Sequence, residues 1–360
     1  MRAQRVVLML AVSLSFMMKP QAQLSDSTRK LLVLDNIETY NLHSSVIGED
    51  YTVYVLKTDN YDTTTNKLPV LYMTDGDWNM TVAMNCFRML RQDYETHEPL
   101  VVGIGYGKNE NKRVRDLDPN GGGPKFLEFL EKEVMPFIDS KYRTNSERAI
   151  YGYSMGGMFT TYVLFNRADL FQKIYIGAPG NNGRLLMPAA REYFKTHNDL
   201  KSKVFIGVGS FEKEVVRNID SFTTFLKAKK LPDFEIMSAI TPDAGHGAAL
   251  GGVMQNAIAF GYCVKHKAVA ISPGMYKNYV GNYTYFENGK KEAEVKILNN
   301  SGKLYISWNN PNGIPDELLP MGNDEFFTPV NERMTFHFRN KELVLKQSDG
   351  KEFRLVKEKK

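Results

Sequence analysis

The sequence predicts an α/β fold, with a mostly parallel sheet covered by helices on both faces, followed by a small antiparallel β-barrel or sandwich. Short apolar strands alternate with helical segments over roughly the first 240 residues, which is typical of a parallel sheet. Beyond about residue 279, short strands recur with turn signals and without helices. A Gly-x-Ser-x-Gly pattern at residues 152–156 lies between a strand and a helix of the first region, which indicates chemistry at the sheet edge.

Residues 1–23 have the features of a secretory signal peptide. Two arginines precede an apolar run over residues 6–18, and Gln21-Ala22-Gln23 follows with small or polar side chains. The run is too short to span a bilayer comfortably, and no later segment is long enough to do so. We therefore predict a secreted or periplasmic protein without a membrane span. A retained N-terminal anchor is the alternative.

The remaining chain is long enough for two domains, which we predict at residues 24–268 and 274–360. Loss of the basic residues of the leader lowers the formal net charge from +5 to +2. A charge this small gives no electrostatic attraction for nucleic acid, so we predict no nucleic-acid partner. Cys86 and Cys263 both lie in apolar, helix-like segments, which favours buried free thiols over a disulfide.

Three short strands open the first region. Residues 30–34, 38–42 and 51–56 alternate apolar and polar side chains, as strands with one solvated face do. A loop at residues 46–50 joins the last two strands, so we expect them to pair as an antiparallel meander.

Buried strands then alternate with helices, which predicts a right-handed, mostly parallel sheet. These strands are continuous apolar runs, as expected when helices cover both faces. The predicted strands span residues 68–73, 100–105, 149–151, 173–177, 203–208 and 234–240, and the predicted helices include residues 80–94 and 125–138. The strand before Gly152 is therefore central in the sheet.

Ser154 lies where this central strand turns sharply into a helix. Such a turn forces the central residue into a strained backbone conformation, and small neighbours such as Gly152 and Gly156 let the strand and helix approach. The hydroxyl of Ser154 is then exposed at the sheet edge, beside the N-terminus of a helix. The alternative is a glycine-rich turn whose serine only caps the helix.

A second glycine-rich segment, Gly103–Lys108, resembles fragments of nucleotide-binding loops but completes neither pattern. Lys108 occupies the position of the last glycine of G-x-G-x-x-G. Val102 and Asn109 replace the first glycine and the Ser/Thr of the Walker pattern. We therefore predict no nucleotide, and we predict no other cofactor and no metal.

An activated serine needs a base, and the base needs an orienting acid. In a serine-hydrolase sheet both follow the serine along the chain, at the carboxyl ends of later strands. His246 fits this position, because it lies in the small-residue loop 242–247 after the strand at 234–240. His266 lies between two lysines and is typical of a solvated linker.

The acid is expected after the strand that ends at Val208. Glu212 is the first carboxylate beyond this strand and is our candidate, and Glu214 is the second. Asp220 falls in the next predicted helix, and Asp243 is so close to the histidine in sequence that it fits loop structure better.

The same geometry predicts an oxyanion hole formed by backbone N–H groups. Met155 directly follows the serine, and the turn Gly76-Asp77-Trp78 follows the strand at residues 68–73. We expect the N–H of Met155 and an N–H of the turn, with Gly76 and Asp77 as candidates, to stabilise an oxyanion.

Six segments, in order, resemble the Putative esterase family of α/β hydrolases, which includes siderophore trilactone esterases, feruloyl esterases and S-formylglutathione hydrolase-like enzymes. The segments are Ser45–Tyr51, Pro69–Asp77, Arg115–Pro119, Phe129–Glu133, Tyr142–Thr144 and Gly152–Gly157. The resemblance extends over about residues 38–263. It implies an α/β-hydrolase fold, hydrolysis of a carboxylic ester by a serine esterase, and catalytic roles for Ser154, His246 and the turn at residues 75–77.

Two departures from this family pattern prevent transfer of a substrate. Many members have histidine before the nucleophile, where this chain has Tyr153. The family's proline-tryptophan segment, which lines the substrate cleft, is replaced by Ala178–Gly183 without tryptophan. Some siderophore-esterase relatives also lack a proper triad acid. A Ser-His dyad is therefore the alternative to a triad that includes Glu212.

The C-terminal region resembles the lipocalin-like domain appended to some secreted bacterial serine hydrolases. Its predicted strands span residues 279–285, 293–297, 304–308, 325–328, 334–338, 343–345 and 353–356. Their spacing of roughly ten residues favours a small barrel or sandwich. We expect this region to pack on the catalytic domain, with ligand binding as the alternative.

The leading interpretation is a secreted serine esterase for a small-molecule or glycan-linked ester, whose oligomeric state the sequence does not define. A serine–lysine acyl transferase is disfavoured, because Ser210-Phe211-Glu212-Lys213 matches S-x-x-K but the chain has no Lys-Thr-Gly triplet. The non-enzymatic alternative is a ligand- or carbohydrate-binding protein on a degenerate hydrolase scaffold. The surviving serine, histidine and elbow glycines argue against it.

Overall fold

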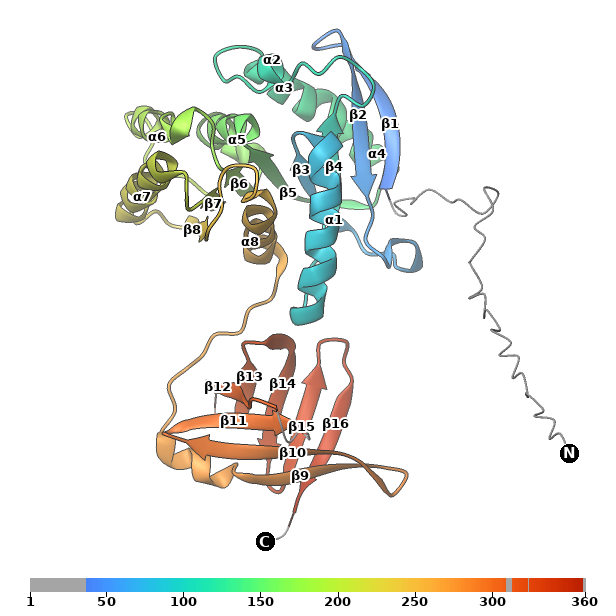
Figure 1. The fold of residues 1–360 in the computed structure, drawn as a ribbon. Coiled ribbons are helices and arrows are strands. Elements are labelled where there is room, and N and C mark those ends of the chain that lie inside the picture. Colours follow the sequence, from blue (N-terminus) through green and yellow to red (C-terminus); the bar gives the residue numbers. More distant parts are fainter. Residues whose placement is uncertain (1–36, 309–312, 323, 359–360) are drawn as a thin grey trace, which may run out of the picture. The chain divides into compact units, whose positions relative to one another are not determined.

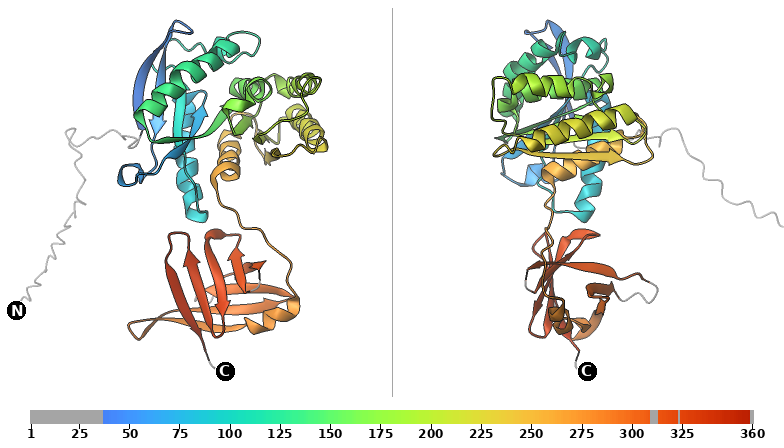
Figure 2. Two further views of the ribbon diagram at one scale, coloured as in Figure 1. Left: turned by 180° about the vertical axis from the view of Figure 1, so that it is seen from behind. Right: turned by 90° about the vertical axis from the view of Figure 1, so that its left-hand side faces the viewer.

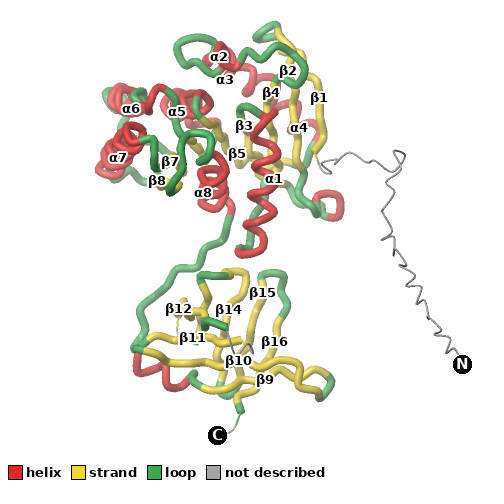
Figure 3. Tube along the Cα trace, in the orientation of Figure 1, coloured by secondary structure: helices red, strands yellow, loops and turns green. Residues whose placement is uncertain are grey.

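A computed structural model describes residues 37–308, 313–322 and 324–358 (Figure 1). The predicted signal peptide and the predicted strand at residues 30–34 lie outside the described residues. Helices and strands alternate between residues 68 and 262, whereas the described residues between 281 and 357 form strands joined by turns (Figure 3). Within the described ranges, the structure contains no helix of the length and apolarity needed to cross a membrane.

The first region is built on one eight-stranded sheet. Its strands are β1 (Ile37–Ser44), β2 (Glu49–Leu56), β3 (Leu68–Met73), β4 (Leu100–Gly105), β5 (Thr144–Tyr153), β6 (Lys173–Gly177), β7 (Lys203–Gly209) and β8 (Glu235–Thr241). They lie in the order β1-β2-β4-β3-β5-β6-β7-β8. β1 and β2 form the predicted antiparallel pair, and β2 also pairs antiparallel with β4. The other six strands, β3 to β8, run parallel to one another. β5 is interior, as predicted for the strand before the nucleophile pattern.

Helices cover both faces of this sheet (Figures 1 and 2). They are α1 (Gly76–Asp93), α2 (Arg113–Asp116), α3 (Gly123–Phe129), α4 (Met135–Lys141), α5 (Met155–Asn166), α6 (Leu186–Tyr193), α7 (Lys213–Ala228) and α8 (Leu250–Tyr262). α1 and α8 pack together on one face, and α5, α6 and α7 pack in succession on the other. The predicted helix at residues 125–138 passes through a π-helical turn between α3 and α4. Pro136, near the start of α4, lacks the N–H that a regular helix would need there.

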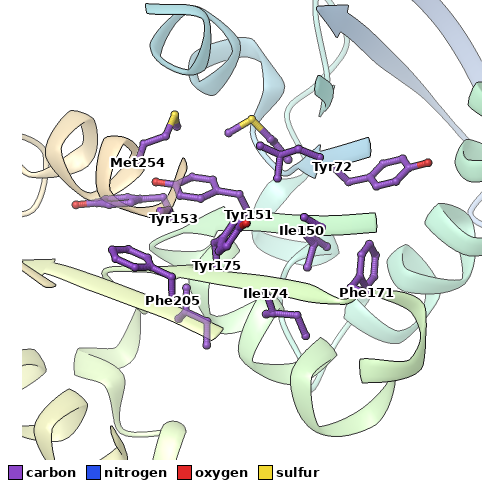
Figure 4. Packing of buried hydrophobic residues seen from close by; sticks show 14 of the residues in the cluster. Tyr72, Ile150, Tyr151, Tyr153, Phe171, Ile174, Tyr175, Phe205 and Met254 are labelled. Carbon is purple, nitrogen blue, oxygen red and sulfur yellow. The ribbon is translucent and has the colours of Figure 1, made fainter. Parts of the chain in front are cut away.

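The side chains of the central strands alternate between the two faces (Figure 4). Tyr151 and Tyr153 of β5 lie on the side of Met254 from α8, whereas Ile150 lies on the opposite side (Figure 4). All four side chains are buried. Tyr153 therefore ends β5 on the face covered by α8, one residue before Ser154.

The C-terminal region is a closed eight-stranded barrel, which resolves the choice between barrel and sandwich. Its strands are β9 (Gly281–Glu287), β10 (Lys290–Asn300), β11 (Lys303–Trp308), β12 (Asp316–Gly322), β13 (Glu325–Thr328), β14 (Asn331–Arg339), β15 (Glu342–Gln347) and β16 (Glu352–Lys357). β16 pairs with β9 and closes the barrel. Large side chains such as Tyr283, Phe326 and Phe336 are buried in its core.

The sequence patterns missed β12, because Pro320 argues against a strand. Proline has no N–H to donate to a ladder, so it is tolerated at irregular positions of a sheet. The pairing of β12 with β13 shifts register between Pro320 and Gly322, which is such an irregular position. The proline therefore argued against a strand that the closed barrel needs.

The Gly152 position provides a test of how closely β5 and α5 approach. A Cβ at Gly152 would lie 2.1 Å from the carbonyl oxygen of Gly156, and backbone cannot rotate away as a side chain can. We expect Gly152→Ala to lower the free energy of unfolding by about 3 kcal/mol, measured by urea denaturation. Gly251→Ala in α8 is the control, because a Cβ there meets nothing within 4 Å. It should be neutral or stabilising by up to about 1 kcal/mol, and equal effects of the two changes would contradict the contact.

Candidate active site

Ser154 occupies a strained turn between β5 and α5. Its backbone has φ 60° and ψ −113°, a conformation that L-residues rarely adopt. The Ser154 N–H donates to the Gly177 carbonyl at 2.9 Å, and its own carbonyl accepts from the Gly180 N–H at 2.8 Å. The turn is thus fixed by the neighbouring strand β6 and the loop after it, as expected for a nucleophile elbow rather than a simple cap.

A second strand-to-helix turn with a positive φ connects β3 to α1. Asp75 has φ 56°, and its carbonyl accepts the N–H groups of Trp78 and Asn79, both at 3.0 Å. Helix α1 therefore begins at Gly76 rather than near Met80 as predicted. The predicted oxyanion turn is the first turn of this helix, because one left-handed aspartate reverses the chain without a separate loop.

The two turns are in close contact. A Cβ at Gly156 would lie 2.3 Å from Thr74 Oγ1 and 3.4 Å from Asp75 Oδ2. The N-termini of α1 and α5 therefore open side by side. The first N–H groups of a helix lack partners within it, so Gly76 and Met155 contribute N–H groups to the same area.

The side chain of Asp77 accepts three hydrogen bonds from neighbouring segments, whereas its backbone N–H is one of the predicted oxyanion donors. Its carboxylate accepts the Tyr54 hydroxyl at 2.6 Å and the N–H groups of Tyr106 and Gly107 at 2.8 and 2.9 Å. A Cβ at Gly105 would lie 2.5 Å from Asp77 Oδ2. Gly105, in the segment that resembles a phosphate loop, thus makes room for the Asp77 carboxylate, which ties α1 to the end of β4.

His246 and Glu212 lie together, although 34 residues separate them. The Nδ1 atom of His246 is 2.8 Å from Glu212 Oε2. Glu212 precedes α7, and its side chain is 17% exposed, whereas that of His246 is 46% exposed. Glu212 Oε1 is buried without a hydrogen-bond partner in the described chain, so the imidazole is the group that compensates this carboxylate.

The other carboxylates considered from sequence lie elsewhere. Glu214 binds Arg184 at 2.7 Å and Asn182 at 3.0 Å from the first turn of α7. Asp220 lies within α7, as predicted, and Asp243 is exposed in a left-handed turn with φ 49°. Among the candidate acids, Glu212 is the one that hydrogen-bonds the histidine.

A cavity of about 250 Å³ contains both Ser154 and His246. Its walls are Asp75, Trp78, Asn79, Arg113, Tyr153, Ser154, His246, Gly247 and Leu250. Residues from the ends of β3, β5 and β8 therefore meet at one place, as carboxyl ends of parallel strands do. The cavity is small, and Trp78 at its wall is 53% exposed.

Sequence reasoning missed Arg113, which comes from α2 and lines the cavity. Its Nε lies 2.7 Å from Asp75 Oδ1 and its Nη2 lies 3.1 Å from Asp75 Oδ2, a bidentate pair. The guanidinium also lies 5.4 Å from the centre of the Trp78 ring. The available signal was the neighbouring Arg115–Pro119 segment, which matched the family pattern two residues further on.

The segment that departs from the family pattern supports the turn at Ser154. Ala178 has φ 34°, and its N–H donates to the Gly207 carbonyl at 2.7 Å. Gly180 holds the Ser154 carbonyl. No residue of Ala178–Gly183 is among those that line the cavity around Ser154 and His246.

The two cysteines are free thiols, as predicted. Cys86 is buried in α1, and Cys263 is half-buried at the end of α8. Burial raises the pKa of Cys86 to about 11 and that of Cys263 to about 12. Both thiols therefore stay protonated at neutral pH.

The fold and these turns define the α/β-hydrolase class, and comparison with known proteins identifies the family. The model of the "Putative esterase" family matches residues 44–231, more than half of the chain. The siderophore triacetylfusarinine C esterase of Aspergillus fumigatus is 26% identical over 230 residues, which covers 57% of this chain and 78% of that enzyme. The ferri-bacillibactin esterase BesA of Bacillus subtilis is 28% identical over 136 residues, covering 31% of this chain and only 47% of that enzyme.

Among solved structures, the BES protein from Bacillus cereus superposes with a TM-score of 0.56 at 20% identity. This superposition covers 64% of the present chain and 97% of the Bacillus cereus chain, and it supports the fold. The chain therefore belongs to the Putative esterase family. It is a carboxylic ester hydrolase of the α/β-hydrolase type.

The Asp75–Arg113 pair can be tested by a double-mutant cycle. The Asp75 side chain is 4% exposed, so Arg113→Met leaves a buried carboxylate without its partner. We expect a loss of about 3–5 kcal/mol in unfolding free energy, measured by urea denaturation. Asp75→Asn keeps a side chain that tolerates the left-handed turn. The double variant should therefore be more stable than Arg113→Met alone, and a double variant that is less stable would contradict the pairing.

Proposed function

We propose that the protein is a secreted serine esterase that uses Ser154 as nucleophile, His246 as general base and Glu212 as the orienting acid. The observation that carries this proposal is the 2.8 Å contact between His246 Nδ1 and Glu212 Oε2, beside a cavity that also contains Ser154. We assign catalysis to a domain at residues 24–268, followed by a β domain at residues 274–360. Secretion rests on the signal-peptide features of residues 1–23.

The contact with Glu212 defines how the imidazole acts. An ionised carboxylate only accepts hydrogen bonds, so Nδ1 of His246 carries the hydrogen and Nε2 is free to accept the Ser154 proton. The serine oxygen attacks the ester carbonyl carbon while this proton moves to Nε2. The imidazolium then returns the proton to the leaving alcohol, and an acyl-enzyme forms. Water activated by the same histidine hydrolyses it and regenerates the serine.

The adjoining helix N-termini supply the oxyanion hole in this proposal. The N–H of Met155 at the start of α5 and an N–H of Gly76 or Asp77 at the start of α1 would stabilise the negative oxygen of the tetrahedral intermediate. Both turns are held by backbone contacts and by the Asp75–Arg113 pair before substrate binds. Donors that need no rearrangement stabilise the transition state most effectively.

We propose a siderophore-type ester as the substrate class, because the relatives described above are named for siderophore esters. Trp78 adds an exposed indole ring at the cavity wall, with the Arg113 guanidinium beside it. An exposed aromatic ring offers a flat apolar surface on which part of a bulky ester can rest.

Replacing Ser154 tests the nucleophile and the substrate class together. The panel contains triacetylfusarinine C, ferri-bacillibactin, enterobactin, methyl ferulate, acetylated xylan and a short aryl ester. We expect hydrolysis of a siderophore ester and of the aryl ester, and Ser154→Ala should reduce both to background with an unchanged thermal unfolding midpoint. Full activity of Ser154→Ala would exclude this nucleophile. A folded wild-type protein that neither hydrolyses an ester nor reacts with a fluorophosphonate would favour a binding protein.

The acid is tested by a pair of neighbouring glutamates. Glu212→Gln keeps the size of the side chain but removes the charge that orients and stabilises the imidazolium, so kcat should fall by about 10³-fold or more. Glu214→Gln is the matched control, because Glu214 binds Arg184 rather than the histidine, and its kcat should stay within about twofold. An active Glu212→Gln enzyme would indicate a Ser-His dyad.

A further inference from the structure

Tyr153 connects the strand that carries the nucleophile to the loop that carries the base. Its hydroxyl donates a hydrogen bond to the backbone carbonyl of His246, with 2.5 Å between the oxygens. The centres of the two rings are 5.3 Å apart, with their planes tilted by 50°. Ser154 directly follows Tyr153 in sequence, so a single side chain spans the two halves of the candidate catalytic site.

The loop that carries His246 is anchored on either side of the histidine. The Phe211 N–H donates to the Ala244 carbonyl and the Ala249 N–H to the Gly245 carbonyl, both at 3.0 Å. The histidine itself lies between these two anchors. Gly245 and Gly247 flank the histidine, and a Cβ at either position would meet nothing within 4 Å. The histidine side chain itself is nearly half exposed. Glycines enlarge the conformational freedom of a loop, so packing alone does not hold the histidine backbone in one position.

Tyr153 is well placed to hold the His246 peptide between these anchors, because its own position is fixed. It ends β5 and is only 7% exposed. Its ring lies against Gly177 of β6, where a Cβ would come within 2.5 Å of the ring atom Cδ2. Desolvation, with a smaller contribution from the Glu212 charge, raises the pKa of Tyr153 above its usual range. The hydroxyl therefore remains protonated and keeps its role as a donor.

We propose that Tyr153 is a positioning residue that fixes the backbone of His246 relative to Ser154, and thereby sets the distance over which the serine proton moves. This inference rests on the proposed serine-esterase function. Glu212 fixes the orientation of the imidazole through Nδ1, and Tyr153 fixes the peptide that carries it. The tyrosine thus has a specific task at the position where many family members have histidine.

Tyr153→Phe removes the hydroxyl and keeps the ring. The ring keeps its buried position, so the fold should persist, but the His246 carbonyl loses this donor and the loop gains freedom. We expect kcat for the aryl ester to fall about tenfold with KM changed by less than about twofold, because a small displacement of a reacting group lowers rate strongly. Amide hydrogen exchange in residues 242–250, measured by mass spectrometry on the full chain, should become faster by a similar factor.

Tyr193→Phe is the matched control, since the Tyr193 hydroxyl also donates to a backbone carbonyl, that of Asp199, at 3.0 Å. This variant should leave kcat and exchange at residues 242–250 unchanged. Wild-type kcat and wild-type exchange in Tyr153→Phe would overturn the inference, even if Ser154→Ala is inactive. Failure of the proposed function shows itself separately, as an inactive wild type or an active Ser154→Ala variant, and the exchange measurement still tests whether Tyr153 holds the loop.

Discussion

The close approach of β5 and α5 is the constraint on which the candidate site depends. The backbone of Gly156 lies where any side chain at Gly152 would have to be, so strand and helix meet without an intervening layer. The short connection forces Ser154 into its left-handed conformation. It also brings Gly156 against Thr74, and this contact sets the second turn beside the first. Two glycines therefore determine where the serine, and the helix N-terminus next to it, are located.

Charges stabilise the second turn, in addition to the close approach of Gly76 to the backbone of Gly103. Asp75 is held by Arg113 on one side, and Asp77 is held by the Tyr106 and Gly107 N–H groups on the other. Two aspartates separated by one residue thus tie the start of α1 to α2 and to the loop after β4. The N–H groups at this helix start are therefore positioned by the fold itself, which the proposed oxyanion hole would require.

The family match ends at residue 231, before β8 and the loop that carries His246. The proposal of His246 as the base therefore depends on geometry in this chain, above all on its hydrogen bond to Glu212. Tyr153 reaches the same loop from β5. The residue before Ser154 and the loop of His246 are thus in direct contact, which a comparison of separate motifs does not reveal.

The sequence alone determined the parallel sheet, its central strand and the pairing of catalytic candidates with strand ends. Continuous apolar runs, glycines and chain order are local features, and a parallel sheet brings strand ends together whatever the loops contain. It did not determine the start of α1 at Gly76, the strand that contains Pro320, or the pairing of Arg113 with Asp75. Each of these depends on groups distant in sequence. Likewise, Glu212 and Glu214 are near-equivalent in sequence, and only the tertiary structure places one against His246 and the other against Arg184.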